Sequence, residues 1–243
     1  MTFDMSMLPE SKQFVYLDDL IIQSTEEINF TNSCCQCLNG CNKSNQCQCL
    51  IASGNCNNYD PASKFLLTTS NPIFECNSSC LCDEQCINRL VQYGKRISTE
   101  VRLIDTTIGY GLFACQSVQA NQFLLEYGGC LYSYGRSDRL LNTCSANAYQ
   151  MYVSIGFAKN SEISLDFVID AQHYGNEARF INHACGESAN LSIFPVWTDS
   201  EWPHAAFFSK RSIKAEIKEV LEQLAYLIIM ATVMFNNHSS FVI

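Results

Sequence analysis

Nine of the fifteen cysteines form two clusters with the same short spacings, a Cys-x-Cys pair and a Cys-x3-Cys step. A disulfide within a Cys-x-Cys pair is strained, because disulfide geometry is hard to reach between such close residues. Thiolates on a tight turn can instead converge on a zinc ion at about 2.3 Å. The spacing therefore predicts metal binding. The predicted ligands are Cys35, Cys37, Cys41, Cys47, Cys49, Cys76, Cys80, Cys82 and Cys86.

Nine thiolates can bind zinc in two ways, and the spacing alone leaves both open. Two separate four-coordinate ions would leave one cysteine over. Three tetrahedral ions need twelve bonds, which nine cysteines supply if three of them each bridge two ions. The thiolates would then outnumber the positive charges, so such a cluster needs N–H donors around its sulfur atoms. The Asn- and Ser-rich residues between the cysteines can provide them.

The cysteine count is odd, and Met1–Glu10 lacks the basic and apolar stretches of a signal peptide. Both features predict reduced thiols in the cytosol or nucleus. Cys34 and Cys56 lie outside the pattern, and we interpret them as free thiols. The most apolar run, Leu224 to Phe235, is shorter than the roughly 18 residues of a membrane span. We therefore expect no membrane partner.

The net charge of −9 argues against direct DNA binding, because a phosphate backbone requires clustered Lys and Arg. An acidic surface fits a basic partner; alternatively, the charge only maintains solubility. A hydrophobic content of 47% in 243 residues is enough for one large packed domain or two small ones. The charged content of 16% argues against a disordered chain.

Changes in composition divide the chain into segments, and these must position the cysteines. Residues 1–33 are acidic, and their apolar stretch from Phe14 to Ile22 predicts a strand or short helix packed on the rest. Residues 34–94 hold the cysteines and lack helical or strand periodicity, so bound metal must supply their folding energy. Between the clusters, residues 50–75 are expected to form an exposed loop.

Residues 97–213 are expected to be mainly β. Short β-like runs alternate with glycine-containing turns, which predicts small curved sheets rather than a parallel α/β sheet. One short helix is predicted at Ser137–Leu141, with Ser137 as its N-cap. Over 214–243, apolar residues recur at helical spacing and predict an amphipathic helix. The predicted strands are Val101–Ile104, Leu112–Ala114, Phe123–Tyr127, Tyr149–Ile155, Phe167–Asp170 and Ala205–Ser209.

The two cysteine clusters closely resemble the pre-SET module of SET-type histone lysine methyltransferases. The resemblance lies in the order of the nine cysteines and in the flanking Phe74-Glu75-Cys76-Asn77 and Asn88-Arg89. In that family the loop-rich module holds a triangular three-zinc cluster and precedes the catalytic domain. Su(var)-type and SETMAR-like enzymes are the most similar members. The resemblance continues through residue 213 and implies a SET domain, with its threaded pseudo-knot, over 97–213.

Two later motifs resemble the family's cofactor site. Gly109-Tyr110-Gly111 is similar to a Gly-Trp-Gly whose backbone lies against S-adenosylmethionine, an approach that glycine permits. A second stretch of the chain resembles the family's motif that holds the adenosyl group. It is Arg179-Phe180-Ile181-Asn182-His183-Ala184-Cys185. The resemblance thus implies S-adenosylmethionine as the cofactor. The implied cofactor-binding residues are Ile108, Gly109, Tyr110, Tyr149, Arg179, Asn182 and His183.

Tyr149 aligns with a tyrosine that lines the family's lysine channel, which implies a catalytic role; the alternative is a strand tyrosine packed on a core. Phe207 and Phe208 would form the wall and core on that side, and Glu126-Tyr127-x-Gly129 resembles a motif that serves the fold. An apolar channel and a sulfonium charge would lower the pKa of the substrate lysine. Aromatic and hydroxyl groups would align its amine with the methyl carbon.

The resemblance implies methyl transfer to histone H3, at lysine 9 first and at lysine 36 or lysine 4 next. It implies the H3 tail, the nucleosome and chromatin proteins as partners, and the nucleus and chromosome as location. An alternative function is a catalytically impaired chromatin- or cofactor-binding module. A third is a zinc-dependent interaction protein without a cofactor site, and the Arg179–Cys185 motif argues against it.

The resemblance breaks after Lys214. There the family continues with Gly-Glu-Glu-Leu-x-Phe-Asp-Tyr, whose tyrosine lines the channel, and with a cysteine tail that forms a fourth zinc site with the equivalent of Cys185. This chain has Ala215–Leu221 instead, and residues 186–243 contain no cysteine. Tyr226 lies in the predicted helix, which argues against a catalytic role. We therefore expect poor or absent catalysis, and a truncated or alternatively spliced product or a faulty gene model.

Overall fold

The computed structural model describes residues 8–23, 34–38, 40–67, 72–133, 149–157, 164–184, 188–214, 220–223 and 227–231. Short strands dominate these residues, as predicted for a mainly β chain, and no helix among them could cross a membrane. The helices are α1 (Gln48–Ala52) and the 3₁₀ helices Glu10–Lys12, Lys43–Asn45, Val91–Tyr93 and Glu177–Phe180. The strands are β1 (Val15–Tyr16), β2 (Leu20–Ile22), β3 (Ile73–Phe74), β4 (Thr99–Asp105), β5 (Gly109–Ala114), β6 (Phe123–Glu126), β7 (Gly129–Ser133), β8 (Gln150–Phe157), β9 (Ser164–Asp170), β10 (Tyr174–Gly175), β11 (Asn182–His183), β12 (Leu191–Trp197), β13 (His204–Ser209), β14 (Glu222–Gln223) and β15 (Leu227–Ala231).

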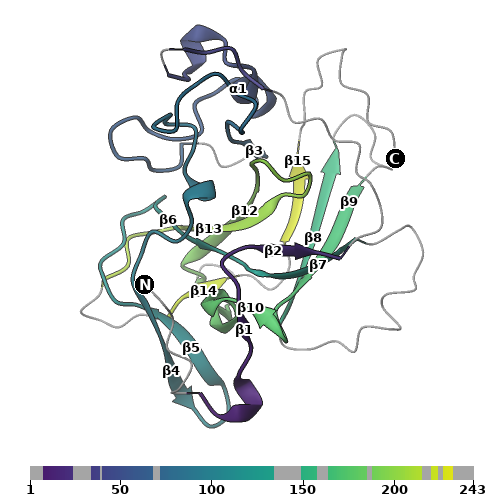
Figure 1. Ribbon diagram of the computed structural model, residues 1–243. Helices are drawn as coiled ribbons and strands as arrows, with labels where there is room; N and C mark the ends of the chain where they lie inside the picture. Colours follow the sequence, from purple (N-terminus) through teal and green to yellow (C-terminus); the bar gives the residue numbers. More distant parts are fainter. Residues whose placement is uncertain are drawn as a thin grey trace.

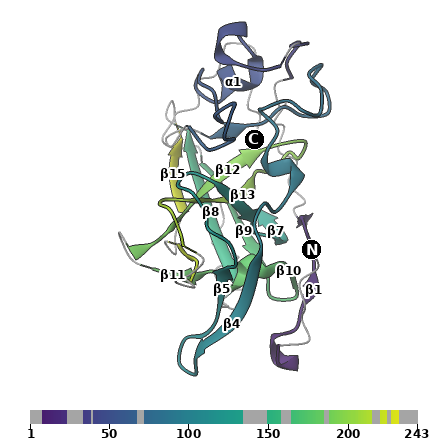
Figure 2. The same ribbon diagram turned by 90° about the vertical axis from the view of Figure 1, so that its left-hand side faces the viewer.

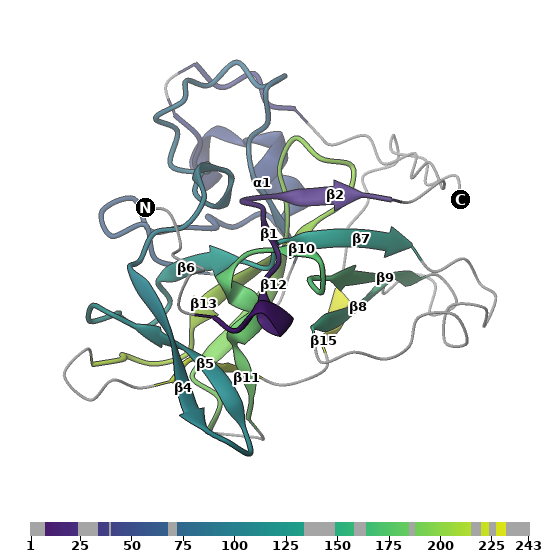
Figure 3. The same cartoon turned by 60° about the horizontal axis from the view of Figure 1, so that its bottom comes forward.

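The largest sheet has five strands in the order β15-β8-β9-β7-β2. Side chains along its strand β8 alternate between the two faces of the sheet. Met151, Val153 and Ile155 are buried, while Tyr152 and Ser154 between them are half-buried. β2 pairs in parallel with β7, and β1 lies alongside β10 (Figure 3). The N-terminal apolar stretch therefore forms strands that pack on the rest of the chain, as one of the two predicted possibilities.

A second sheet joins the cysteine module to the rest of the molecule. Its order is β3-β12-β13-β6, and every residue of β6 and β13 is buried. β3 pairs in parallel with β12 and leads directly into Cys76, so the second cysteine cluster begins at the edge of this sheet. The cysteine module with α1 forms one end of the molecule and the β4–β5 hairpin the opposite end (Figures 1 and 2).

Residues 50–67 and 72–75 are not simply the exposed loop that the sequence predicted. Leu50, Tyr59, Leu66 and Ile73 are all buried, and the last three belong to a core cluster that contains Phe208. The prediction failed because polar residues dominate this stretch and obscured a few widely spaced apolar side chains. These side chains fix the stretch against the four-stranded sheet.

The last segment is not the predicted helix where the structure describes it. β14 pairs in parallel with β11, and β15 pairs in parallel with β8 at the edge of the large sheet. Leu221 is buried, and its N–H donates to the Leu112 carbonyl at 2.8 Å. Backbone pairing with other strands thus outweighs the helical preference that the spacing of the apolar residues indicates. The predicted helix Ser137–Leu141 lies outside the described residues, as do 215–219, 224–226 and 232–243.

Candidate functional site

The structure brings the nine predicted zinc ligands together. They come from the loop before α1, from the start of α1 and from the loop after β3. Eight of them are buried and form a core cluster with Leu50, and Cys37 packs against that cluster. The interior of the module therefore consists almost entirely of sulfur, with very little apolar surface to hold it together.

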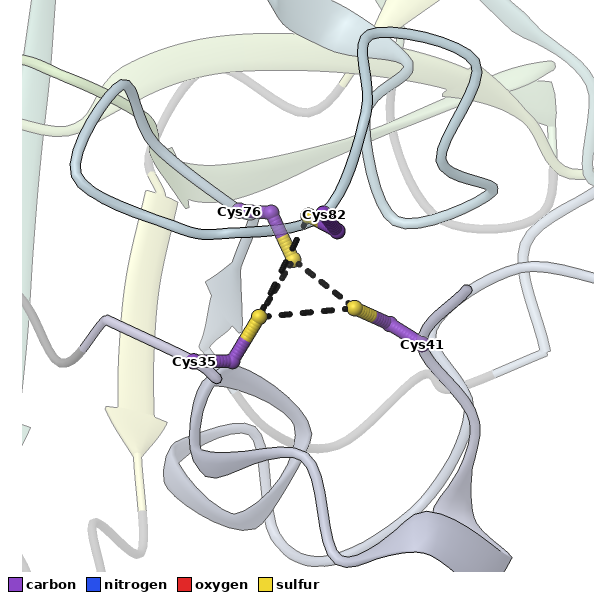
Figure 4. Close-up of side chains that lie close together, drawn as sticks. All are labelled: Cys35, Cys41, Cys76 and Cys82. Carbon is purple, nitrogen blue, oxygen red and sulfur yellow. Dashed lines mark hydrogen bonds between the residues drawn. The ribbon is translucent and has the colours of Figure 1, made fainter. Parts of the chain in front are cut away.

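Three sulfur atoms form a triangle at the centre of the cluster (Figure 4). Cys35 Sγ lies 3.5 Å from Cys41 Sγ and 3.9 Å from Cys76 Sγ, and Cys41 Sγ lies 3.5 Å from Cys76 Sγ. Two thiolates on one tetrahedral zinc ion lie about 3.8 Å apart, given a Zn–S bond of about 2.3 Å. Each side of the triangle therefore fits a pair of sulfur atoms that share an ion.

The grouping of the remaining sulfur atoms favours three shared ions over two separate ones. Three sets of four cysteines have sulfur atoms within 4.8 Å of one another; Cys35 occurs in all three sets, and Cys41 and Cys76 each occur in two. These three are placed to bridge. Cys86 also interacts with Cys41, Cys76 and Cys82. The terminal pairs are then Cys37 with Cys47, Cys49 with Cys80, and Cys82 with Cys86.

At least two of the crowded thiols, those of Cys37 and Cys82, resist ionisation without a cation. Burial and repulsion from Cys47 and Cys35 raise the pKa of Cys37 to about 12. Burial and repulsion from Cys86 raise the pKa of Cys82 to about 11. A bound metal ion removes this penalty, because it binds the thiolate form and compensates its charge. The donor set therefore fits zinc.

N–H groups point at the sulfur atoms, as a negatively charged cluster requires. Two backbone N–H groups donate to Cys80 Sγ at 3.3 Å. The Asn88 side-chain amide donates to Cys76 Sγ at 3.4 Å, and the Arg89 guanidinium donates to Cys82 Sγ at 3.7 Å. Arg89 also adds a positive charge beside the thiolates. These contacts stabilise the thiolate form and orient the ligands.

A buried carboxylate, which the sequence offered only as part of the Phe-Glu-Cys-Asn flank and with no structural role, fixes the module to the four-stranded sheet. Glu75 is 2% exposed and accepts hydrogen bonds from the Tyr59 hydroxyl at 2.7 Å and from the N–H groups of Leu90 and Val91 at 2.9 and 2.8 Å. The Tyr59 ring stacks on Phe208, with ring centroids 6.4 Å apart. The sequence signal for Glu75 was its place in the Phe74-Glu75-Cys76-Asn77 flank, which does not show that the carboxylate is buried.

The second site lies where β5 meets β11. Gly109 has a φ of +87°, which favours glycine. A Cβ on Gly111 would lie 2.6 Å from Ile104 and 2.8 Å from the Asn182 amide, so the position has no room for a side chain. The Asn182 amide also donates to the Tyr110 carbonyl at 3.5 Å. Two motifs predicted separately from the sequence thus meet in space.

Arg179 lies buried among aromatic rings beside this junction. It is 5% exposed, and its guanidinium carbon lies 3.8 Å from the ring centroid of Tyr149 and 4.3 Å from that of Phe14. Burial lowers the pKa of Arg179, and the ring faces partly compensate its charge. Its Nε and Nη1 atoms have no hydrogen-bond partner among the described residues. An acceptor on a bound molecule would complete the site.

Tyr149 is held at this junction from two sides. The Tyr127 hydroxyl donates to the Tyr149 carbonyl at 2.8 Å, so the Glu-Tyr-x-Gly motif positions the start of β8. Burial raises the pKa of Tyr127 well above its ordinary value. The Phe180 ring lies 6.4 Å from the Tyr149 ring and 6.3 Å from the Tyr110 ring. Phe207 is fully buried behind Tyr127, which places it in the core.

The remaining predicted residues lie at the rim. Ile108 is 59% exposed, with its N–H held by the Asp105 carboxylate at 2.7 Å. His183 is exposed and lies in β11, opposite Gln223 of β14. Cys185 lies outside the described residues. Sequence reasoning missed Phe14, because nothing in the first 33 residues connects them with Arg179.

A buried His–Glu pair makes the stability of this fold depend on pH. His204 Nδ1 lies 2.5 Å from Glu126 and 3.7 Å from Asp19, and Nε2 contacts the Thr198 hydroxyl at 3.1 Å. Burial alone would lower the pKa of His204, but Glu126 outweighs burial and raises it. Because the folded pKa lies above the unfolded value of about 6.5, the stabilisation is complete below about pH 6.5 and is lost as pH rises through the folded pKa.

We therefore expect His204→Gln to lower the free energy of unfolding by about 3 kcal/mol at about pH 6 and by less at about pH 9. Denaturant unfolding of both proteins across this range measures the difference. A difference that does not change with pH, or that grows as pH rises, would contradict the charged pair.

Comparison with known proteins finds two family matches that follow one another along the chain. The Pre-SET motif matches residues 2–89, and the SET domain matches residues 109–217. Su(var)3-9 of Drosophila melanogaster is 31% identical over 179 residues, which are 72% of this chain and 27% of that protein. SUV39H2 of Xenopus tropicalis is 32% identical over 163 residues, 65% of this chain and 38% of that protein. The chain thus spans less than half the length of these relatives.

Solved structures show the same architecture. The methyltransferase domain of human SETMAR superposes with a TM-score of 0.69 at 28% identity, over 86% of this chain and 74% of that one. SUVH6 of Arabidopsis thaliana in complex with SAM superposes with a TM-score of 0.73 at 25% identity, over 88% of this chain and 44% of the SUVH6 chain. Fold and matches together define a pre-SET module followed by a SET domain. Within that class, the chain belongs to the Su(var)-type family of SET proteins, which confirms the resemblance seen in the sequence.

Proposed function

We propose that this chain transfers methyl groups from S-adenosylmethionine to a lysine of histone H3. The observation that carries the proposal is the meeting of Gly109–Gly111 with Asn182, beside Tyr149 and Arg179. These residues lie far apart in the sequence, and each was predicted to serve the same reaction. The names of the relatives as histone-lysine N-methyltransferases, and of SUVH6 as a complex with SAM, support the same reaction.

The chain's own groups fit the proposed cofactor. The backbone at Gly109, where nothing lies within 4 Å of an added Cβ, permits close approach, and the Asn182 amide and the unpaired Nε and Nη1 of Arg179 offer hydrogen-bond donors to its polar groups. Ile108, Tyr110 and His183 would complete the rim. When bound, S-adenosylmethionine supplies a methyl group activated by its sulfonium charge. The three zinc ions would take no part in the chemistry and would hold the cysteine module, which joins the SET domain through the pairing of β3 with β12.

The target lysine must present a neutral amine. The aromatic side chains of Tyr110, Tyr149 and Phe180 surround the junction, and such apolar walls lower the pKa of a lysine that enters between them. The Tyr149 hydroxyl would accept a hydrogen bond from the amine and hold its lone pair in line with the methyl carbon. The proton leaves to solvent before transfer.

The proposed substrate is the histone H3 tail, at lysine 9 first and at lysine 36 or lysine 4 next. The net charge of −9 fits a basic tail through long-range attraction. Action on H3 implies the nucleosome and chromatin proteins as partners, and the nucleus and chromosome as location. Within this proposal, residues 34–94 form the zinc module and residues 97–213 the SET domain.

A second candidate is a cofactor-binding chromatin module with impaired turnover. One observation favours it: Ala215–Leu221 stands where the family has Gly-Glu-Glu-Leu-x-Phe-Asp-Tyr. The sequence excluded Tyr226 as a substitute tyrosine because of a predicted helix. The flanking residues 222–223 and 227–231 form strands, so that reason no longer holds. Tyr226 itself lies outside the described residues.

Binding and turnover measured separately distinguish the two candidates. Calorimetry on the zinc-loaded chain measures S-adenosylmethionine binding, and labelled methyl transfer to H3 peptides centred on lysine 9, lysine 36 or lysine 4 measures turnover. Binding with transfer supports the enzyme, and binding without transfer supports the impaired module. Absence of both would overturn the two candidates together.

We expect Tyr149→Phe to lower turnover on the H3 peptide by about 100-fold, because the amine loses the group that orients it. Cofactor affinity should change little. Tyr152→Phe is the matched control: Tyr152 lies in β8, three residues after Tyr149, and the variant removes a hydroxyl that donates to Gln150 Oε1 at 3.0 Å. Equal losses in the two variants would show that Tyr149 serves only the fold of β8.

A further inference from the structure

The N-terminal segment lies against the proposed methyl-transfer site. Leu8 and Phe14 are buried in the main core cluster, and the 3₁₀ helix Glu10–Lys12 lies between them. The Phe14 ring lies 6.1 Å from the Phe180 ring and 4.3 Å from the guanidinium carbon of Arg179. Two buried side chains therefore hold Lys12 between them beside the residues assigned to the reaction.

Lys12 places an amine on the tyrosine that was predicted to align the substrate amine. Its Nζ donates to the Tyr149 hydroxyl at 3.1 Å and lies 5.5 Å from the centroid of the Tyr149 ring. Lys12 is exposed, so its proton can pass to solvent. Among the lysines that the structure describes, it is the one with an amine in contact with Tyr149.

The segment is also fixed on its far side. The Val15 N–H donates to the His173 carbonyl at 2.8 Å, and the Leu17 N–H donates to the Gly175 carbonyl at 2.7 Å, as part of the pairing of β1 with β10. A lysine tethered in this way reacts at an effective concentration far above that of a free peptide. The tether and the contact with Tyr149 together favour Lys12 as an acceptor.

We infer that Lys12 is an intramolecular methyl acceptor of this chain. The inference rests on the proposed function. The Lys12 ammonium first loses a proton to solvent, and the neutral amine then attacks the methyl carbon of S-adenosylmethionine. A new C–N bond forms while the C–S bond breaks, and the sulfur keeps the electron pair. The products are the protonated secondary amine of N-methyl-Lys12 and a neutral thioether, and the one proton released is the one that left before the attack.

The full zinc-loaded chain, incubated with deuterated-methyl S-adenosylmethionine and mapped by peptide mass spectrometry, tests this. Label is expected on Lys12, with a rate per molecule that does not change when the protein is diluted tenfold. Lys12→Arg should remove this label. Lys43→Arg is the matched control, because Lys43 is also exposed and also lies in a 3₁₀ helix; its loss should leave the label on Lys12 unchanged.

Three results would overturn the inference. An unlabelled Lys12 beside a labelled H3 peptide would overturn it while leaving the proposed function intact. A rate per molecule that falls with dilution would show transfer between molecules. No label on either substrate would overturn the proposed function and, with it, this inference.

Discussion

Removal of zinc by a chelator is expected to unfold the cysteine module, with rapid amide exchange over residues 34–56 and 76–89. The reason is the make-up of its interior, where eight buried cysteines surround a single larger apolar side chain, Leu50. A structural zinc ion contributes about 10–16 kcal/mol of binding free energy, far more than so small an apolar cluster supplies. Hydrogen exchange with and without the chelator measures the effect.

The strands β8 and β9 should keep their protection longer, because their core is apolar and separate from the sulfur cluster. Cys35→Ser should reproduce much of the loss, since Cys35 occurs in all three groups of sulfur atoms and would bridge two ions. Cys34→Ser is the matched control, because Cys34 is next to Cys35 in the sequence, yet its own side chain is exposed and lies outside the cluster. A module that keeps its protection without metal, or equal effects of the two variants, would contradict the cluster.

The second large effect is expected at Gly111. Gly111→Val should weaken S-adenosylmethionine binding more than tenfold, because a side chain there would lie within 3 Å of Ile104, Asn182 and Val220 and would displace the Asn182 amide. Calorimetry measures the affinity. Asn182→Ala should weaken binding too, by removing the amide without adding bulk, and it keeps the test informative if Gly111→Val fails to fold.

Gly94→Ala is the control for glycine replacement as such. Gly94 has a φ of +75° and no atom within 4 Å of an added Cβ, so alanine there adds backbone strain without a clash. It should lower stability by about 1 kcal/mol and leave cofactor affinity unchanged. Unchanged affinity in Gly111→Val and Asn182→Ala would place the cofactor elsewhere.

The spacing of the cysteines was enough to predict which of them come together as a cluster of thiols. The Cys-x-Cys and Cys-x3-Cys steps limit the cysteines to a metal cluster whatever the path of the intervening chain. The six predicted strands are confirmed within a few residues, because each carries a β-rich run between turns. Spacing alone could not choose between two and three ions, since that choice depends on the distances between sulfur atoms in the folded loops; the family resemblance implied three.

The failures share one physical cause, which is pairing between distant segments. Leu221 and the strand β15 follow a helical spacing, yet their backbone groups are satisfied by β5, β8 and β11. Tyr59 and Glu75 are isolated in a polar stretch, and only the partner strands show that they are buried. Phe14 reaches Arg179 from a segment with no local sign of that contact.

The most direct test of the account is transfer of a labelled methyl group from S-adenosylmethionine to recombinant histone H3 by the full zinc-loaded chain. We predict that histone H3 takes up the labelled methyl group, that Gly111→Val abolishes this transfer and that Tyr149→Phe strongly reduces it. Tight cofactor binding by a folded, zinc-loaded chain that leaves H3 unlabelled would contradict it.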